Sequence, residues 1–247
     1  MRKFAIVLTS LTSLGVVASA QAQQGPSVGD VAAYAALSST PVGAMTPVVT
    51  SAMLGRIAKG YSVAGQYGHL SDNGAGFNAF GASVSMPVSG FSLGGSLGFW
   101  SPSGGTNDKS NLMLGLNAET NIGAWAIGDG KDANLFTMSV RSDFGWANPD
   151  DGTGTGNSIT ALSLSAGVPV ALVLKTGDMT FAPFVTPGLG WGRLSATGAS
   201  ESGSRFMMGA GIGMAHRNGW GVSVGMQKVF IDQGKAVFGL NLSYRKQ

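Results

Sequence analysis

The sequence predicts an all-β protein: an antiparallel up-and-down transmembrane β-barrel of about ten strands, preceded by a signal peptide and a short, partly helical N-terminal segment. The first observation is composition, since 40 of 247 residues are Gly and only 11% are charged, while 44% are hydrophobic. Ordinary domains contain about 7% Gly and about 25% charged residues. The second is the lack, after the first few tens of residues, of the ~20 consecutive apolar residues that a membrane helix needs. The third is a series of short alternating runs, and a closed barrel is the other fold that satisfies its backbone in lipid.

The alternation is clearest at the C-terminal end, in residues 236–244. Phe238, Leu240, Leu242 and Tyr244 share one face of an extended chain, and Val, Gly, Asn and Ser fill the other. A period of two is typical of a strand with two unlike faces. A bulky apolar face that ends in an aromatic residue, opposite a face of small polar residues, suits lipid outside and a polar lumen inside.

The run V-F-G-L-N-L-S-Y resembles the C-terminal assembly signal of bacterial outer-membrane barrels, in which Gly239, Leu242 and Tyr244 take the characteristic positions. Here Arg245, Lys246 and Gln247 follow, whereas such proteins usually stop at the aromatic residue. The run from Val168 to Trp191 is similar to a hairpin of small OmpA-like, opacity-like and porin-like outer-membrane proteins. The resemblance implies export through the periplasm to the bacterial outer membrane, contact with its lipid and lipopolysaccharide, and recognition of the last strand by the barrel-assembly machinery.

Three regions follow from the pattern. Residues 1–22 form the signal peptide, because Arg2 and Lys3 precede an apolar run and the A-S-A-Q-A sequence allows cleavage after Ala20 or Ala22. Residues 23–59 form a lead-in, and residues 60–247 form the barrel. Its expected strands are 60–70, 76–88, 91–100, 110–122, 134–146, 159–174, 179–193, 204–216, 219–230 and 235–244. Eight strands, or twelve if residues 28–58 add a hairpin, are the alternatives. The absence of Cys excludes disulfides and thiolate metal sites.

The lead-in has three interpretations. Thr46 followed by Pro47 predicts the start of a short helix that continues to Lys59, and Asp30 could cap another. The segment is then a loosely ordered periplasmic stretch, a helix that enters the barrel as a plug, or a helix on a membrane surface. We expect a lumen filled with water rather than with residues 28–58.

Turn lengths follow from the requirement that like faces stay together in neighbouring strands. Parity predicts a two-residue turn at Val88-Ser89 or Ser89-Gly90, another at Thr176-Gly177, and a three-residue loop, Arg217-Asn218-Gly219, with Gly219 left-handed. Long polar connections follow the odd-numbered strands, so both termini are expected to face the periplasm. Pro183 and Pro187 fall inside a central strand, where bulges near the rims would accommodate them.

Four ionisable residues fall on the luminal rows: Glu119, Arg141, Asp143 and Arg205. Charged residues inside membrane proteins are usually paired or functional. If the connection between strands centres on Gly130, Glu119 faces Arg141 and the two can form an ion pair; the alternative is that each is simply solvated by luminal water.

The function expected from these features is that of a non-enzymatic integral barrel, either a narrow passive pore for small solutes or a structural surface protein. No catalytic residue, cofactor, metal or nucleic-acid partner is expected. The alternative is an outer-membrane lipid hydrolase, because His69-Leu70-Ser71 resembles the His-x-Ser motif of the lipid A deacylase family, although Asp72, the nearest acid, points to the other face. A secreted soluble ligand-binding barrel is a further alternative.

Overall fold

The computed structural model describes residues 27–44, 54, 60–72, 75–103, 111–128, 133–148, 159–196, 199–232 and 234–246. The expected signal peptide lies outside these residues. So does the expected helix from Thr46 to Lys59, apart from Leu54.

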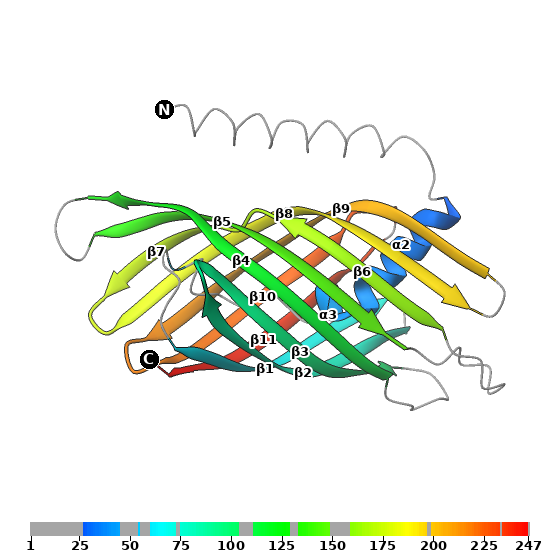
Figure 1. Ribbon diagram of the computed structural model, residues 1–247, viewed down its shortest axis with the longest axis horizontal. Coiled ribbons are helices and arrows are strands. Elements are labelled where there is room, and N and C mark those ends of the chain that lie inside the picture. The colour runs from blue at the N-terminus through cyan, green and yellow to red at the C-terminus, as the bar shows by residue number, and fades with distance from the viewer. Residues whose placement is uncertain are drawn as a thin grey trace.

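A closed antiparallel barrel forms most of the described chain (Figure 1). Its strands are β1 Tyr61–Asp72, β2 Ala75–Val88, β3 Phe91–Ser103, β4 Asn111–Ile127, β5 Asn134–Ala147, β6 Thr160–Gly167, β7 Val170–Thr176, β8 Met179–Ala196, β9 Ala199–His216, β10 Trp220–Val229 and β11 Ala236–Lys246. Neighbours in sequence pair with one another, and β1 pairs with β11 to close the ring. Strands β6 and β7 lie end to end between β5 and β8, so together they occupy one position in the wall. The barrel is therefore ten-stranded, which confirms the predicted fold and strand number.

The break between β6 and β7 lies opposite a proline. Val168 donates its backbone N–H to the carbonyl oxygen of Pro187 at 2.9 Å, so the backbone carbonyl of Pro187 points toward the break. Proline has no N–H for a ladder, and Pro169 lies at the break itself. Val168 and Pro169 nevertheless keep the register of β6 and β7, since Val168 donates to Pro187 and the carbonyl of Pro169 accepts from Ser139. The predicted bulges near the rims were wrong. Strand β8 pairs with β9 from Met179 to Ala196, and the irregularity belongs to the neighbouring strand.

The two faces of the wall follow the predicted parity. The exposed face carries large apolar side chains, including Phe80, Leu97, Leu116, Leu164, Phe238, Leu240 and Leu242, which are 47–62% exposed. The inner face carries buried small or polar residues such as Ala79, Ser139, Ser163 and Ser223. This arrangement is the reverse of a soluble protein and matches an outward apolar band with a polar interior.

Two of the three predicted turns are correct. Ser89 and Gly90, with φ 47° and 88°, form the turn between β2 and β3, and the loop Arg217-Asn218-Gly219 has φ 101° at Gly219. The third turn is Gly177-Asp178, not Thr176-Gly177, so Leu174 rather than Leu172 lies opposite Phe181. A type II′ turn needs Gly at its first central position, where Gly177 has φ 58°. Parity alone does not separate these two registers.

In the described part of the chain, two helices lie within the ring of strands. Helix α2, Val28–Ser39, lies against β6, β8 and β9, and the short α3, Pro41–Ala44, reaches β1, β3, β4, β5, β6 and β10 (Figure 1). Among the described residues, no helix has the length and apolar character that a membrane crossing requires. Because α2 and α3 contact the inner face of the strands, the segment 27–44 is an internal plug, and we call it the plug below.

Candidate functional site

The plug begins with a capping box. Ser27 Oγ accepts the backbone N–H of Asp30 at 3.3 Å, and Asp30 Oδ2 accepts the backbone N–H of Ser27 at 2.8 Å. This reciprocal pair satisfies two of the donors that a helix N-terminus leaves open. Asp30 is thus the third helical residue rather than the expected cap itself. The Ala-rich run that follows has high helix propensity, and it buries Ala33, Ala36 and Leu37.

Glycines of the wall make room for the plug. An added Cβ at Gly192 would lie 2.7 Å from the carbonyl oxygen of Ala33, and one at Gly190 would lie 2.7 Å from Leu37. Similar collisions would occur at Gly145 with Thr40 (2.7 Å) and at Gly115 with Pro41 (2.9 Å). We call these four residues, Gly115, Gly145, Gly190 and Gly192, the glycine cradle. The small luminal residues thus admit a helix, whereas the sequence interpretation assigned the space to water.

Polar contacts fix the plug at three points. Asp30 pairs with Arg205 of β9, and the two side chains are 18% and 9% exposed. The hydroxyl groups of Thr40 and Ser163 lie 2.6 Å apart and are buried. Gln227 of β10 donates to the carbonyl oxygen of Val42 at 2.7 Å. These contacts come from three different strands, β6, β9 and β10, which lie on one arc of the ring together with β8.

The other predicted luminal charges lie near the middle of the wall. Arg141 and Asp143, two residues apart on β5, form a bidentate pair with distances of 2.6 to 3.0 Å, and Ser165 donates to the same carboxylate at 3.4 Å. Glu119 lies opposite Arg141 in the register of β4 and β5, as the sequence predicts, and Glu119 accepts from Ser139 at 2.6 Å. Arg205 stands apart from this group, against the plug.

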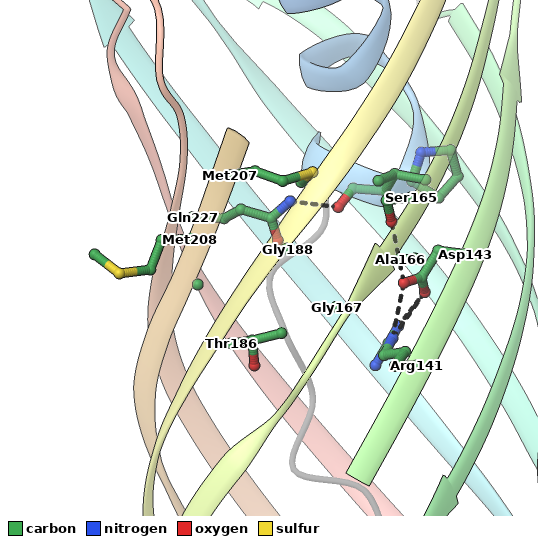
Figure 2. A pocket seen from close by; sticks show the side chains of 13 residues that line it. Arg141, Asp143, Ser165, Ala166, Gly167, Thr186, Gly188, Met207, Met208 and Gln227 are labelled. Carbon is green, nitrogen blue, oxygen red and sulfur yellow. Dashed lines mark hydrogen bonds and ion pairs between the residues drawn. The ribbon is translucent and has the colours of Figure 1, made fainter. Parts of the chain in front are cut away.

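Beneath the plug is a small cavity of about 50 Å³. Figure 2 shows Arg141, Asp143 and Ser165 on one side of it, with Gln227 on the other. A volume of this size holds a few water molecules. Nearby, Phe184 of β8 points inward, is 4% exposed and packs on Ala171, and an added Cβ at Gly211 would touch its ring at 2.8 Å. The described lumen is therefore largely filled by protein.

The family is evident from a sequence comparison. A family model described as an outer membrane protein beta-barrel domain matches residues 75–245, more than half of the chain. The chain belongs to this family. Together with the apolar outer face, membership places the protein in the outer membrane of a Gram-negative bacterium.

Solved structures with a similar fold include several outer-membrane barrels. The N-terminal β-barrel domain of OprF from Pseudomonas aeruginosa has 9% identity and a TM-score of 0.32, over 78% of this chain and 99% of that one. Ail, the attachment invasion locus protein of Yersinia pestis, has 12% identity and a TM-score of 0.35, over 76% and 100%. Omp33 of Acinetobacter baumannii has 9% identity and a TM-score of 0.28, over 77% and 99%. No curated protein sequence matches the chain.

The candidate hydrolase motif lies on the outside of the barrel. His69 is half-buried on the outward row of β1, and its Nδ1 lies 2.8 Å from Asn78 Oδ1, which also accepts the hydroxyl of Tyr67 at 2.8 Å. An amide oxygen that accepts from Tyr67 can accept from His69 too, which makes Nδ1 the protonated nitrogen. The described partner of this imidazole is therefore an amide rather than a carboxylate, and the side chains of Ser71 and Asp72 lie outside the described set.

The residues of the expected assembly signal all lie in β11. Leu242 faces outward and is 52% exposed, Gly239 pairs with Gly68 and Gly225, and Tyr244 stacks near Trp220 with ring centroids 5.0 Å apart. Their recognition by assembly machinery stays a prediction.

Sequence reasoning missed most of the plug contacts, namely those of Thr40, Gln227 and the glycine cradle. Two signals were present: the Ser27-to-Asp30 spacing of a capping box, and the Ala-rich run after it. Neither reveals which strand the helix would meet, because Ser163 is 123 residues from Thr40 and Gln227 is 185 residues from Val42.

Proposed function

We propose that the protein is a non-enzymatic outer-membrane barrel with a structural role at the cell surface, and that its own N-terminal segment keeps its lumen closed at rest. The observation that carries this proposal is the glycine cradle: four wall positions lack a side chain where one would collide with the plug. A lumen that had to stay open for solutes would have no need of this fit.

The polar contacts support a plug that stays docked. Each of the pairs Asp30–Arg205, Thr40–Ser163 and Val42–Gln227 is buried or nearly so. Leaving such groups without partners in a dry interior costs about 1–3 kcal/mol for each neutral group, and more for a charge. The docked state is therefore favoured over one in which the plug is released but the lumen stays narrow.

The direct test is single-channel conductance in a planar bilayer. We expect the intact mature protein to conduct little, and a variant without residues 28–44 to conduct more, because the deletion removes α2 and α3 from the lumen. Heat-dependent migration on a gel checks that each form is folded. Equal conductance of both folded forms would refute the closed barrel.

A cysteine lock provides a second test that does not shorten the chain. The protein contains no Cys, and the hydroxyl groups of Thr40 and Ser163 are 2.6 Å apart, so a Thr40→Cys, Ser163→Cys variant should form a disulfide between plug and β6. We expect the oxidised form to stay closed. Channel openings should occur only after the disulfide is reduced. The two single variants are the controls.

A passive pore is the second candidate. The cavity lined by Arg141 and Asp143 favours it, because a polar constriction of this kind selects among small ions. It predicts that Asp143→Asn, together with Arg141→Gln, alters the ion selectivity of the intact protein.

A further inference from the structure

We infer that the plug begins at the mouth of the barrel opposite to the one where β1 begins, so that Ser27 lies at the cell surface while Leu54 and Gly60 lie at the periplasmic mouth. The inference concerns the direction of the chain and is independent of whether the barrel conducts. The loop lengths led to the expectation that both termini face the periplasm; the inference keeps the end of β11 there and differs from that expectation for the start of the plug.

The two mouths of the barrel differ in their connections. One mouth carries the tight turns Ser89-Gly90, Gly177-Asp178 and Arg217–Gly219, together with Tyr61 at the start of β1 and Lys246 at the end of β11. The same mouth carries the connection 128–133. The other carries the connections 73–74, 104–110, 148–159, 197–198 and 230–235, of which 104–110 and 148–159 are the longest between the described strands. Short turns are typical of the periplasmic side and long connections of the outer side. The first mouth is thus periplasmic, and the second faces the cell surface.

The start of the plug lies at the surface mouth. Strand β9 begins there at Ala199, and an added Cβ at Gly29 would lie 2.7 Å from the carbonyl oxygen of its residue Ser202. Asp30 reaches Arg205 a short way further along the same strand. Tyr34 accepts the backbone N–H of Lys235, which precedes β11 at this mouth, at 3.2 Å. Figure 1 shows α2 beginning at the end of the barrel where β8 and β9 project.

The other end of the segment lies at the periplasmic mouth. Leu54 lines a small cavity with Ser62, Gly219, Trp220 and Arg245, all of which lie at or near the tight-turn end. Gly60, with φ 84°, immediately precedes β1. A left-handed residue of this kind allows a sharp change of direction where β1 begins.

The distance between these anchors suits a crossing. Val42 is held near the middle of the barrel by Gln227, and Leu54 is twelve residues later. Twelve residues can span up to about 40 Å when extended, which exceeds half of a membrane crossing. The order Ser27, Val42, Leu54, Gly60 therefore runs in one direction through the ring, from surface to periplasm.

Cysteine labelling on intact cells tests this direction, because the protein has no Cys of its own. The test variant is Val28→Cys, whose side chain is 70% exposed in the first turn of α2. Asn218→Cys in a tight turn is the periplasmic control, and Ser200→Cys at the start of β9 is the surface control. The probe is a polyethylene-glycol maleimide too large to pass through porins.

We expect Val28→Cys and Ser200→Cys to react on intact cells, and Asn218→Cys to react only after the outer membrane is permeabilised. Labelling of Val28→Cys only after permeabilisation, while Ser200→Cys reacts on intact cells, would overturn the inference. Reversed reactivity of the two controls would also overturn it, because the barrel would then point the other way.

A second variant keeps the test independent of the first turn of α2. An epitope inserted immediately before Gly25, after the expected cleavage site, leaves the described plug unchanged. We expect an antibody to bind it on intact cells. An epitope detected only in permeabilised cells that contain the folded barrel would contradict the inference.

Discussion

The glycine cradle makes a specific prediction about Gly192. In Gly192→Ala, the new Cβ would lie 2.7 Å from Ala33 O, 2.9 Å from Ala36 Cβ and 3.0 Å from Ala33 Cα. Ordinary contacts begin at 3.4 Å, so these three contacts are too short by 0.4 to 0.7 Å and the helix must move away by about that much. Two of the three atoms are helix backbone, which cannot rotate aside.

Overpacking of this kind typically costs about 1–3 kcal/mol. The cost applies to the docked state alone, since alanine fits a β-strand without the plug. The ratio of docked to released plug should therefore fall about 5- to 150-fold, at about 1.4 kcal/mol per factor of ten. We expect this change as a higher fraction of time in the open state in single-channel records.

The matched control is Gly65→Ala on β1. An added Cβ at Gly65 meets nothing within 4 Å, so this variant makes the same chemical change without touching the plug. We expect it to behave like the unaltered protein. If Gly192→Ala and Gly65→Ala give the same open fraction, the fit between plug and wall does not hold the barrel closed.

Two further predictions concern the wall and the ion pair of the plug. Leu240 lies in the middle of β11 and is 47% exposed, so Leu240→Arg should destabilise the folded barrel by about 2–4 kcal/mol, as measured by urea titration in lipid vesicles. Tyr61→Arg, at the rim where β1 begins, should cost only about 0–1 kcal/mol. Similar costs would show that Leu240 does not face the membrane centre. Asp30→Ala and Arg205→Ala should each raise the open fraction, because each single variant leaves the other charge buried without its partner. The free-energy effect of the double variant should be smaller than the sum of the two single effects. Strict additivity would mean that the two side chains do not interact.

The wall of this barrel was largely predictable from the sequence, because it depends on parity. Phe238, Leu240 and Leu242 face outward because a period of two leaves no alternative once lipid is outside, and the same parity places Glu119 opposite Arg141. Parity cannot choose between two registers that differ by two residues, as at Gly177. It holds across Val168 and Pro169, where β6 and β7 share one register against both neighbours.

The contents of the lumen were not predictable in the same way. A row of Gly and Ser is compatible with water and with a helix, because both require only that side chains be absent. The deciding information is the match between Gly190 or Gly192 and the Ala-rich face of α2, and that match depends on positions far apart in sequence. The sequence predicted a helix at Thr46–Lys59, from a cap followed by Pro, while the helix observed in the lumen is α2.

The seam between β1 and β11 has a consequence for the order in which the molecule is assembled. These strands hydrogen-bond from Tyr61–Lys246 to His69–Phe238, and they close a ring around a segment that is covalently continuous with β1. A chain that passes through a closed ring cannot enter from the side once the seam has formed. The N-terminal segment must then lie across the growing sheet before its edges meet, or slide lengthwise through a finished ring already narrowed by Phe184 and Met207. The first route needs no release of the Thr40–Ser163 and Val42–Gln227 contacts, so the plug can act as the template around which the last seam closes.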